Sequence, residues 1–241
     1  MDADKRFIII TVIVTLGILI GAVVWATSQT PRVTPEQSIA SEVLVSDRIY
    51  NTRGSQQAPI TIVEFSDPQC PACKDAALDA TSILDEYQGL VKLIYRHFPL
   101  PIHNQSIPAS RAVEAAGRQG KFNEMLDGIF ANQDRLENEG DEFLKEIAIS
   151  LELNMDQFEQ DRKSEEIANI VKNDADTAMQ IGVSYTPSFF INGKLLPINN
   201  NQTRLQSLQA GVTEALNQIN PDNLPITTPS DSAIESTSSS N

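Results

Sequence analysis

The first pattern along the chain is an unbroken apolar run. Residues 7–26 (FIIITVIVTLGILIGAVVWA) carry no charge, and Lys5 and Arg6 precede them. A run of this length at the helical rise covers ~30 Å, which matches one hydrocarbon core. It therefore predicts one N-terminal transmembrane helix, with residues 1–6 in the cytoplasm and the remaining chain on the extracytoplasmic side of the cell membrane. A cleavable signal peptide is the alternative, although its apolar core is usually about 7–15 residues long.

After this run the pattern becomes polar and then periodic. Residues 27–42 are mostly polar and contain two prolines, which predicts a tether. Residues 43–218 carry the short apolar runs and amphipathic spacings of one globular domain. Residues 219–241 are rich in Ser, Thr and Pro and predict a disordered tail.

Two short apolar runs predict the central strands of the domain. They are residues 60–65 (ITIVEF) and 91–98 (VKLIYRHF), which are rich in β-branched and aromatic residues. Weaker signals predict an edge strand at residues 43–45 and a turn at residues 53–55.

A later strand pair is predicted by an Asn-Gly dipeptide. Asn192-Gly193 stands between two apolar runs, and this is the strongest short signal for a hairpin with a type I′ turn. Residues 188–191 and 194–196 should therefore pair antiparallel. Pro187 stands at the head of the first strand, where no ladder N–H is required.

Amphipathic spacing predicts the helices. A helix that opens at Cys70 ends at Gly89, and its apolar stripe consists of Cys73, Ala77, Ala80, Leu84 and Tyr87. Helical spacing continues through residues 104–182, interrupted by an acidic connection at residues 132–141, and predicts a helical subdomain inserted between the strands. Residues 201–219 predict a last helix.

The only two cysteines, Cys70 and Cys73, lie where the first central strand gives way to a helix. A thiol at that position meets free backbone N–H groups and the positive end of the helix dipole. The pKa of Cys70 can therefore fall from ~8.5 into the range of roughly 3.5–7.5. Pro71 suits the first helical turn, and Cys73 lies one turn on, toward the buried side. Cys70 should be the partly exposed, attacking sulfur of a dithiol/disulfide exchange site.

Three other uses of these cysteines compete with redox exchange. A structural zinc site needs about four ligands, yet there is no second cysteine pair, and His97 and His103 lie on another segment. A copper-carrier site lacks an accompanying Met- or His-rich cluster. An inert structural disulfide would stabilise weakly, because a two-residue loop removes little chain entropy.

Charge and one acidic side chain add to this picture. The net charge of −14 argues against a nucleic-acid surface. Glu64 falls within the first apolar strand, six residues before Cys70. It is either an outward-facing polar position or a partly buried acid near the dithiol that exchanges protons with Cys73.

Four segments resemble the DsbA-like branch of the thioredoxin superfamily. They are residues 58–67 (APITIVEFSD), 69–73 (QCPAC), 95–100 (YRHFPL) and 186–193 (TPSFFING), in the order found in that branch. The resemblance extends over roughly residues 43–216. It implies a thioredoxin-like α/β fold with an inserted helical subdomain.

The resemblance also implies roles for particular residues. The Thr186–Pro187 bond is expected to be cis and to pack against the dithiol, and the backbone of Thr186 is expected to pair with the substrate chain. Glu64 matches the buried acid of the branch. Tyr185 departs from it, since relatives often carry Gly there, and would reshape the substrate groove.

The expected activity is that of a membrane-tethered disulfide oxidase acting on cysteine-containing exported proteins. Reoxidation would need a membrane quinone-linked thiol oxidase, and no metal or organic cofactor is implied. Pro71 and Ala72 offer no histidine to favour the thiolate, so moderate oxidising power is expected. The alternatives are a reductase or isomerase using the same site, and a tethered binding module or holdase with a passive disulfide.

Overall fold

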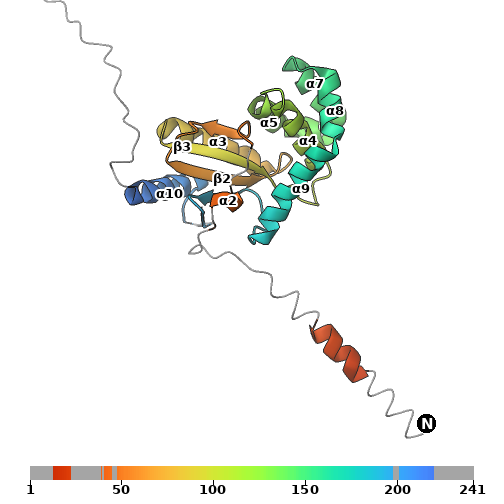
Figure 1. Ribbon diagram of the computed structural model, residues 1–241, viewed down its shortest axis with the longest axis vertical. Coiled ribbons are helices and arrows are strands. Elements are labelled where there is room, and N and C mark those ends of the chain that lie inside the picture. The colour runs from red at the N-terminus through yellow and green to blue at the C-terminus, as the bar shows by residue number, and fades with distance from the viewer. Residues whose placement is uncertain (1–12, 23–38, 40, 45–47, 198–200, 220–241) are drawn as a thin grey trace, which may run out of the picture.

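The computed structural model describes residues 13–22, 39, 41–44, 48–197 and 201–219. At its centre lies a five-stranded sheet in the order β1-β3-β2-β4-β5 (Figure 1). Strand β2 runs parallel to β3 and antiparallel to β4. The strands are β1 (Thr52–Gly54), β2 (Ile60–Ser66), β3 (Val91–His97), β4 (Ser188–Ile191) and β5 (Lys194–Leu195).

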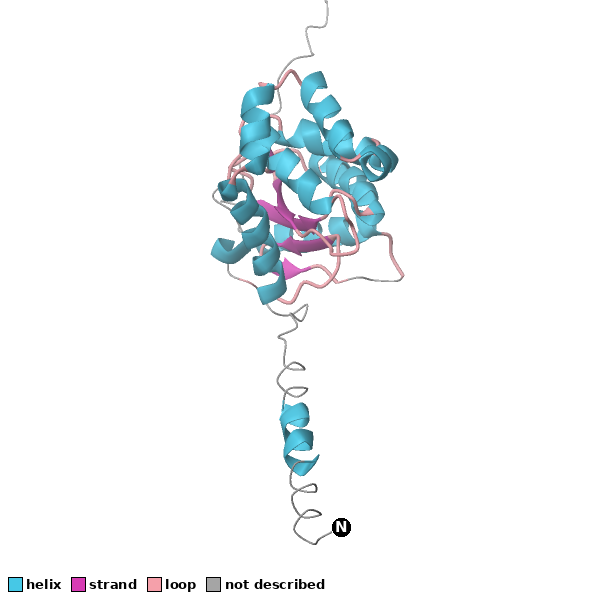
Figure 2. Ribbon diagram, turned by 90° about the vertical axis from the view of Figure 1, so that its right-hand side faces the viewer, coloured by secondary structure: helices cyan, strands magenta, loops and turns pink. Residues whose placement is uncertain are grey.

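Helices cover both faces of this sheet (Figure 2). Because alternate residues of a strand point to opposite faces, Ile60 and Ile62 of β2 pack with α3 (Pro71–Glu86) and α10 (Arg204–Gln218). Val63 and Phe65 pack on the other face, against α2 (Ser41–Leu44) and α9 (Glu165–Gln180). The two faces thus have separate apolar cores.

A layer of six helices connects β3 to β4, as the sequence predicted. Its own core combines alanine, branched aliphatic and aromatic side chains, and Cys70 and Cys73 belong to it. The helices are α4 (Ser106–Gly117), α5 (Phe122–Ala131), α6 (Gln133–Glu139), α7 (Asp141–Ser150), α8 (Met155–Lys163) and α9.

The predicted hairpin is confirmed. Strands β4 and β5 pair antiparallel, and Asn192 and Gly193 both have positive φ, of 45° and 87°, as a type I′ turn requires. The last helix, α10, is also confirmed and begins with a capping box formed by Thr203 and Gln206.

Three local predictions are wrong. Residues 43–45 were expected to form an edge strand, but Ser41–Leu44 form a helical turn that buries Leu44 on the sheet. Residues 53–55 are not a turn, because Thr52–Gly54 form β1 beside β3. Within residues 132–141, the expected connection is helix α6, which the buried Leu136 attaches to the core.

The apolar stripe of α3 is rotated from its predicted position. The buried residues are Cys73, Ala76, Ala80 and Ile83. Ala77, Leu84 and Tyr87 are only half-buried, because α3 also contacts the helical layer along one side and α10 along the other. Burial of Cys73, which bears on the chemistry, is confirmed.

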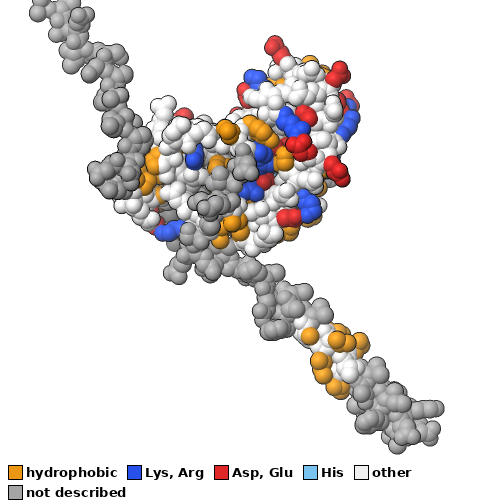
Figure 3. Space-filling view, viewed as in Figure 1, with side chains coloured by type: hydrophobic (Ala, Val, Ile, Leu, Met, Phe, Trp, Pro, Cys, Tyr) orange, Lys and Arg blue, Asp and Glu red, His pale blue; other side chains and the backbone are white. Residues whose placement is uncertain are grey.

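Residues 13–22 form a helix whose apolar side chains are exposed (Figure 3). Within the described ranges, no helix combines the length and apolar character needed to cross a membrane. The rest of the predicted span at residues 7–26 lies outside the described residues. So do most of the predicted tether at residues 27–42 and nearly all of the predicted tail at residues 219–241.

Candidate active site at the start of helix α3

The two cysteines occupy different environments at the first turn of α3. Cys70 is the N-cap residue with extended backbone, and Pro71 stands at the first helical position. Cys70 keeps 7 % of its surface exposed, whereas Cys73 keeps none. Cys70 is more covered than the sequence predicted, but it is the more accessible of the two.

The environment of Cys70 favours its thiolate. Its pKa is lowered to about 5, first by a hydrogen bond from Cys73, then by the side chain of Thr186 and by the backbone N–H groups of Cys73 and Ala72. The backbone donors were expected from the helix start. The larger contribution of the partner cysteine was not expected.

The segment that faces Cys70 carries the predicted cis peptide bond. Thr186–Pro187 is cis, and the carbonyl oxygen of Thr186 lies 3.8 Å from the Cys70 sulfur. Tyr185, 37 % exposed, lies beside them. Tyr185, Thr186 and Pro187 line a groove of about 290 Å³ that runs past Ala72 to the start of α10.

Arg204 forms part of the same groove, and the sequence analysis did not identify it. Its Nε donates to Asp79 at 2.7 Å and its Nη1 donates to the carbonyl oxygen of Ala72 at 3.3 Å. The guanidinium group of Arg204 thus contacts the Cys-Pro-Ala-Cys segment, although Arg204 lies more than a hundred residues later in the sequence. No local sequence pattern could have indicated that contact.

Cys73 points into a buried polar group of side chains, which we name the sulfur cluster: Cys73, Glu64, Ser66 and Tyr95. Burial raises the pKa of Cys73, and nearby Glu64 adds to the effect. Burial also raises the pKa of Glu64, to about 7. Glu64 is 2 % exposed, so the alternative of an outward-facing position is wrong and the predicted buried acid is confirmed.

Two buried side chains hold the loop before Cys70. The carboxylate of Asp67 accepts hydrogen bonds from Gln69 N, Leu100 N, His103 Nδ1 and Ser106 Oγ, at 2.6–2.9 Å. This arrangement ties the loop to the segment that leads into α4. Asp67 follows the strand immediately and could have been suspected from its position.

Gln133 of α6 provides the second attachment. Its Nε2 donates to the carbonyl oxygens of Pro68 and Cys70, at 2.9 and 3.0 Å. The helical layer therefore holds the backbone of the reactive cysteine directly. The sequence analysis placed Gln133 in an acidic connection and missed this role.

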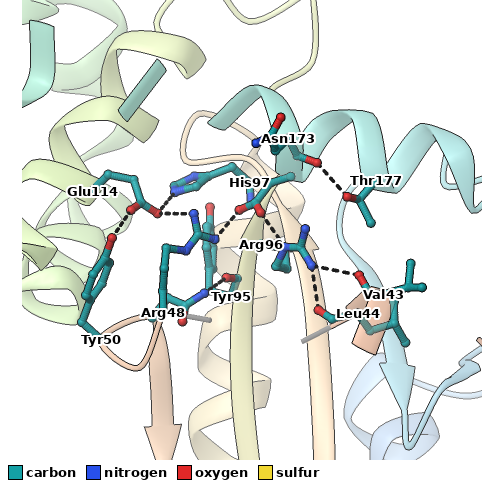
Figure 4. Close-up of polar contacts among 12 residues, drawn as sticks. Val43, Leu44, Arg48, Tyr50, Tyr95, Arg96, His97, Glu114, Asn173 and Thr177 are labelled. Carbon is teal, nitrogen blue, oxygen red and sulfur yellow. Dashed lines mark hydrogen bonds and ion pairs between the residues drawn. The ribbon is translucent and has the colours of Figure 1, made fainter. Parts of the chain in front are cut away.

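A second group of mostly buried polar side chains, drawn in part in Figure 4, is linked by ion pairs, and we name it the clamp cluster: Arg48, Arg96, His97, Glu114 and Asp174. Glu114 accepts from His97 and Arg48, at 2.9 and 3.1 Å. Asp174 accepts from Arg96 and Arg48, both at 2.6 Å. The cluster links β3 to α4, to α9 and to the segment before β1.

Three members of the clamp cluster are of the types that bind metals. Ligand atoms of His97, Glu114 and Asp174 lie within 4.8 Å of one another. Two guanidinium groups already occupy the carboxylates, however, and a cation would have to displace them. The arrangement is that of an ion-pair network.

Most of this chain is similar in sequence to part of a longer protein. The chain is 32 % identical over 190 residues to the Na⁺/H⁺ antiporter NhaA 1 of Mycobacterium sp. (strain KMS), a match that covers 74 % of this chain and 30 % of the antiporter. The chain thus spans about a third of the length of that relative.

Several solved structures share the fold. A thioredoxin-like oxidoreductase from Silicibacter pomeroyi DSS-3 is 26 % identical with a TM-score of 0.61, covering 72 % of this chain and 98 % of that one. The thiol-disulfide exchange protein alpha-DsbA2 from Wolbachia pipientis is 22 % identical with a TM-score of 0.62, covering 72 % and 90 %. The sequence profile of the family described as Thioredoxin matches residues 49–210, and the chain belongs to that family.

Proposed function

We propose that this protein is a thiol–disulfide oxidoreductase that works as a disulfide oxidase on cysteine-containing exported proteins. The observation that carries the proposal is the asymmetry of the two sulfurs. Cys70 is the more accessible and has a pKa lowered to about 5, whereas Cys73 is enclosed and has a raised pKa. A family relationship to oxidoreductases supports the same chemistry.

The oxidase cycle follows from that asymmetry. A substrate thiolate attacks Cys70 of the Cys70–Cys73 disulfide, and Cys73 leaves and is protonated. The second thiolate of the substrate then attacks its own sulfur in the mixed disulfide and expels Cys70 as a thiolate. Because a low thiol pKa favours the reduced enzyme and a fast departure, the environment of Cys70 favours oxidation of the substrate.

The groove beside Thr186 would hold the substrate chain, with the backbone of Thr186 pairing as to an added strand. Tyr185 and Arg204 would contact residues next to the substrate cysteine. The proposed setting is extracytoplasmic, with the apolar N-terminal segment as the membrane anchor. A membrane quinone-linked thiol oxidase would reoxidise the dithiol there.

A redox titration against glutathione, followed by thiol alkylation, tests the direction of electron flow. A reduction potential of about −120 mV for the cysteine pair supports the oxidase, and one of about −270 mV supports the reductase or isomerase. Cys73→Ala should accumulate mixed disulfides at Cys70, and Cys70→Ser should abolish exchange. Retention of binding activity by Cys70→Ser, with no exchange by the native protein, would instead support a holdase.

A further inference from the structure

The sulfur cluster brings four polar groups together away from solvent. Cys73, Glu64, Ser66 and Tyr95 are all buried. The register of β2 and β3 sets Glu64 directly beside Tyr95, and the strand pleat places Ser66 on the same face as Glu64, two residues nearer to Cys70. The cluster is therefore positioned by the two central strands and by the first turn of α3.

The Ser66 hydroxyl is shared within this cluster. The hydroxyl lowers the pKa of Cys73, of Glu64 and of Tyr95, so it lies near all three. Ser66 Oγ, Glu64 Oε1 and Tyr95 Oη have no hydrogen-bond partner within the described residues. A hydroxyl rotates and can donate to one neighbour while it accepts from another.

Unpaired buried polar groups lower the stability of the folded protein, so a cluster with a purely structural role would be expected to pair them. Leaving a buried polar group unpaired costs about 1–3 kcal/mol, and most buried polar atoms in proteins are paired. A hydroxyl that changes hydrogen-bond partners during a reaction, in contrast, cannot be held by one fixed partner in the resting protein. The cluster adjoins a sulfur that gains and loses a proton in the proposed exchange.

We propose that Ser66 is a catalytic residue that carries a proton between the carboxyl group of Glu64 and the sulfur of Cys73. This inference rests on the proposed function. When an incoming thiolate bonds to the Cys70 sulfur, the Cys70–Cys73 bond breaks and the Cys73 sulfur takes its electron pair. The Ser66 hydroxyl donates its proton to that sulfur and accepts the proton of the Glu64 carboxyl. The thiolate is oxidised to the mixed disulfide, the enzyme disulfide is reduced, and Glu64 becomes a carboxylate.

The other members of the cluster fit this assignment. Glu64, with a pKa of about 7, can hold or release the proton near neutral pH, as a general acid should. Burial raises the pKa of Tyr95 well above its ordinary value, so its hydroxyl keeps its proton and can donate it in a hydrogen bond. Tyr95 is a positioning residue for the Ser66 hydroxyl.

The test measures how fast glutathione forms a mixed disulfide with the oxidised full chain in detergent. Samples are acid-quenched, alkylated and analysed by mass spectrometry between pH 5 and 9, and rates are expressed per glutathione thiolate. The native rate constant should fall as pH rises through about 7, where Glu64 loses its proton. Ser66→Ala should be at least about tenfold slower below pH 7 and lose this pH dependence.

Further variants separate a relay from a structural effect. Glu64→Gln should show the same flat profile, and the S66A/E64Q double variant should be no slower than the slower single variant, because both groups serve one path. Ser66→Thr keeps the hydroxyl and should recover most of the rate. Ser110→Ala removes another buried, unpaired hydroxyl, in α4, and should retain the native profile.

The outcomes also separate this inference from the proposed function. A native rate and pH profile in folded Ser66→Ala would overturn the relay and leave the exchange activity standing. A flat profile in Tyr95→Phe, with a native profile in Ser66→Ala, would also overturn it, because Tyr95 would then be the carrier. If the native chain forms no adduct at Cys70, the proposed function fails, and the relay with it.

Discussion

The protein buries acidic side chains in two places and satisfies them in opposite ways. In the clamp cluster, Glu114 and Asp174 each contact Arg48, and each has a further basic partner (Figure 4). In the sulfur cluster, Glu64 makes no ion pair within the described residues, and one of its oxygens has no hydrogen-bond partner.

This difference suits the clamp cluster to a structural role and the sulfur cluster to proton transfer. A paired buried carboxylate is fixed, because losing one partner leaves a charge without compensation. An unpaired buried carboxyl prefers its neutral form and titrates near neutral pH, where a small change in its surroundings moves a proton. The same sheet thus carries a rigid ionic group facing α4 and α9 and a titratable group facing α3.

The largest effect should come from breaking the clamp cluster. Asp174→Ala leaves Arg96 and Arg48 without their shared carboxylate and should lower the free energy of unfolding by about 3–5 kcal/mol. Chemical denaturation measures this. Thiol exchange per folded molecule should stay near the native level, since Asp174 does not belong to the sulfur cluster. In Asp174→Ala, the total exchange rate should fall only in proportion to the folded fraction. A lower exchange rate per folded molecule would contradict the separate roles of the two clusters.

A smaller effect, of opposite sign, should come from Glu64. Its folded pKa of about 7 is raised from an ordinary 4.5, so its contribution to stability is full below pH 4.5 and is lost as pH rises through 7. Glu64→Gln removes this dependence and should stabilise the protein at pH 8 by up to about 3 kcal/mol, with little change at pH 4.5.

The Glu64 measurement is made on the oxidised protein, in which neither cysteine titrates. Denaturant midpoints of the native and Glu64→Gln proteins are compared across this pH range. A constant difference between the two proteins at every pH would show that the Glu64 carboxyl does not titrate near 7 in the folded state.

The smallest effect is expected from removing the hydroxyl of one tyrosine in each region: Tyr50 beside Glu114, and Tyr95 beside Glu64. Tyr50 Oη donates to Glu114 at 2.7 Å, so Tyr50→Phe should cost about 1–2 kcal/mol. Tyr95 Oη has no hydrogen-bond partner among the described residues, so Tyr95→Phe removes an unpaired buried hydroxyl and should not lower the stability. Thermal unfolding of the two variants measures the contrast, and equal losses would remove the distinction between the clusters.

The sequence alone predicted the parts of this structure that depend on local patterns. The two central strands, the Asn192-Gly193 hairpin, the helical insertion and the burial of Cys73 follow from periodicity and turn chemistry. The cis bond before Pro187 followed only from family resemblance, because spacing does not determine peptide isomers.

The contacts that complete the site join residues far apart in the chain. Gln133 reaches the Cys70 carbonyl, and Arg204 reaches that of Ala72, across separations of 63 and 132 residues. Neither stands in a pattern that marks it. Ser66 directly follows the strand predicted at residues 60–65 and extends it in the structure, and only the sheet register brings it near Tyr95 of the neighbouring strand.

The attachment of the segment before β1 has a mechanical consequence. Arg96 donates to the carbonyl oxygens of Val43 and Leu44, and Ile39 N donates to Gly193 O. Tension arriving from the N-terminal side would therefore be borne by the sheet face opposite the cysteines and by the β4–β5 turn. The reactive sulfurs face the opposite side of the sheet, so a load carried by these contacts would bypass them.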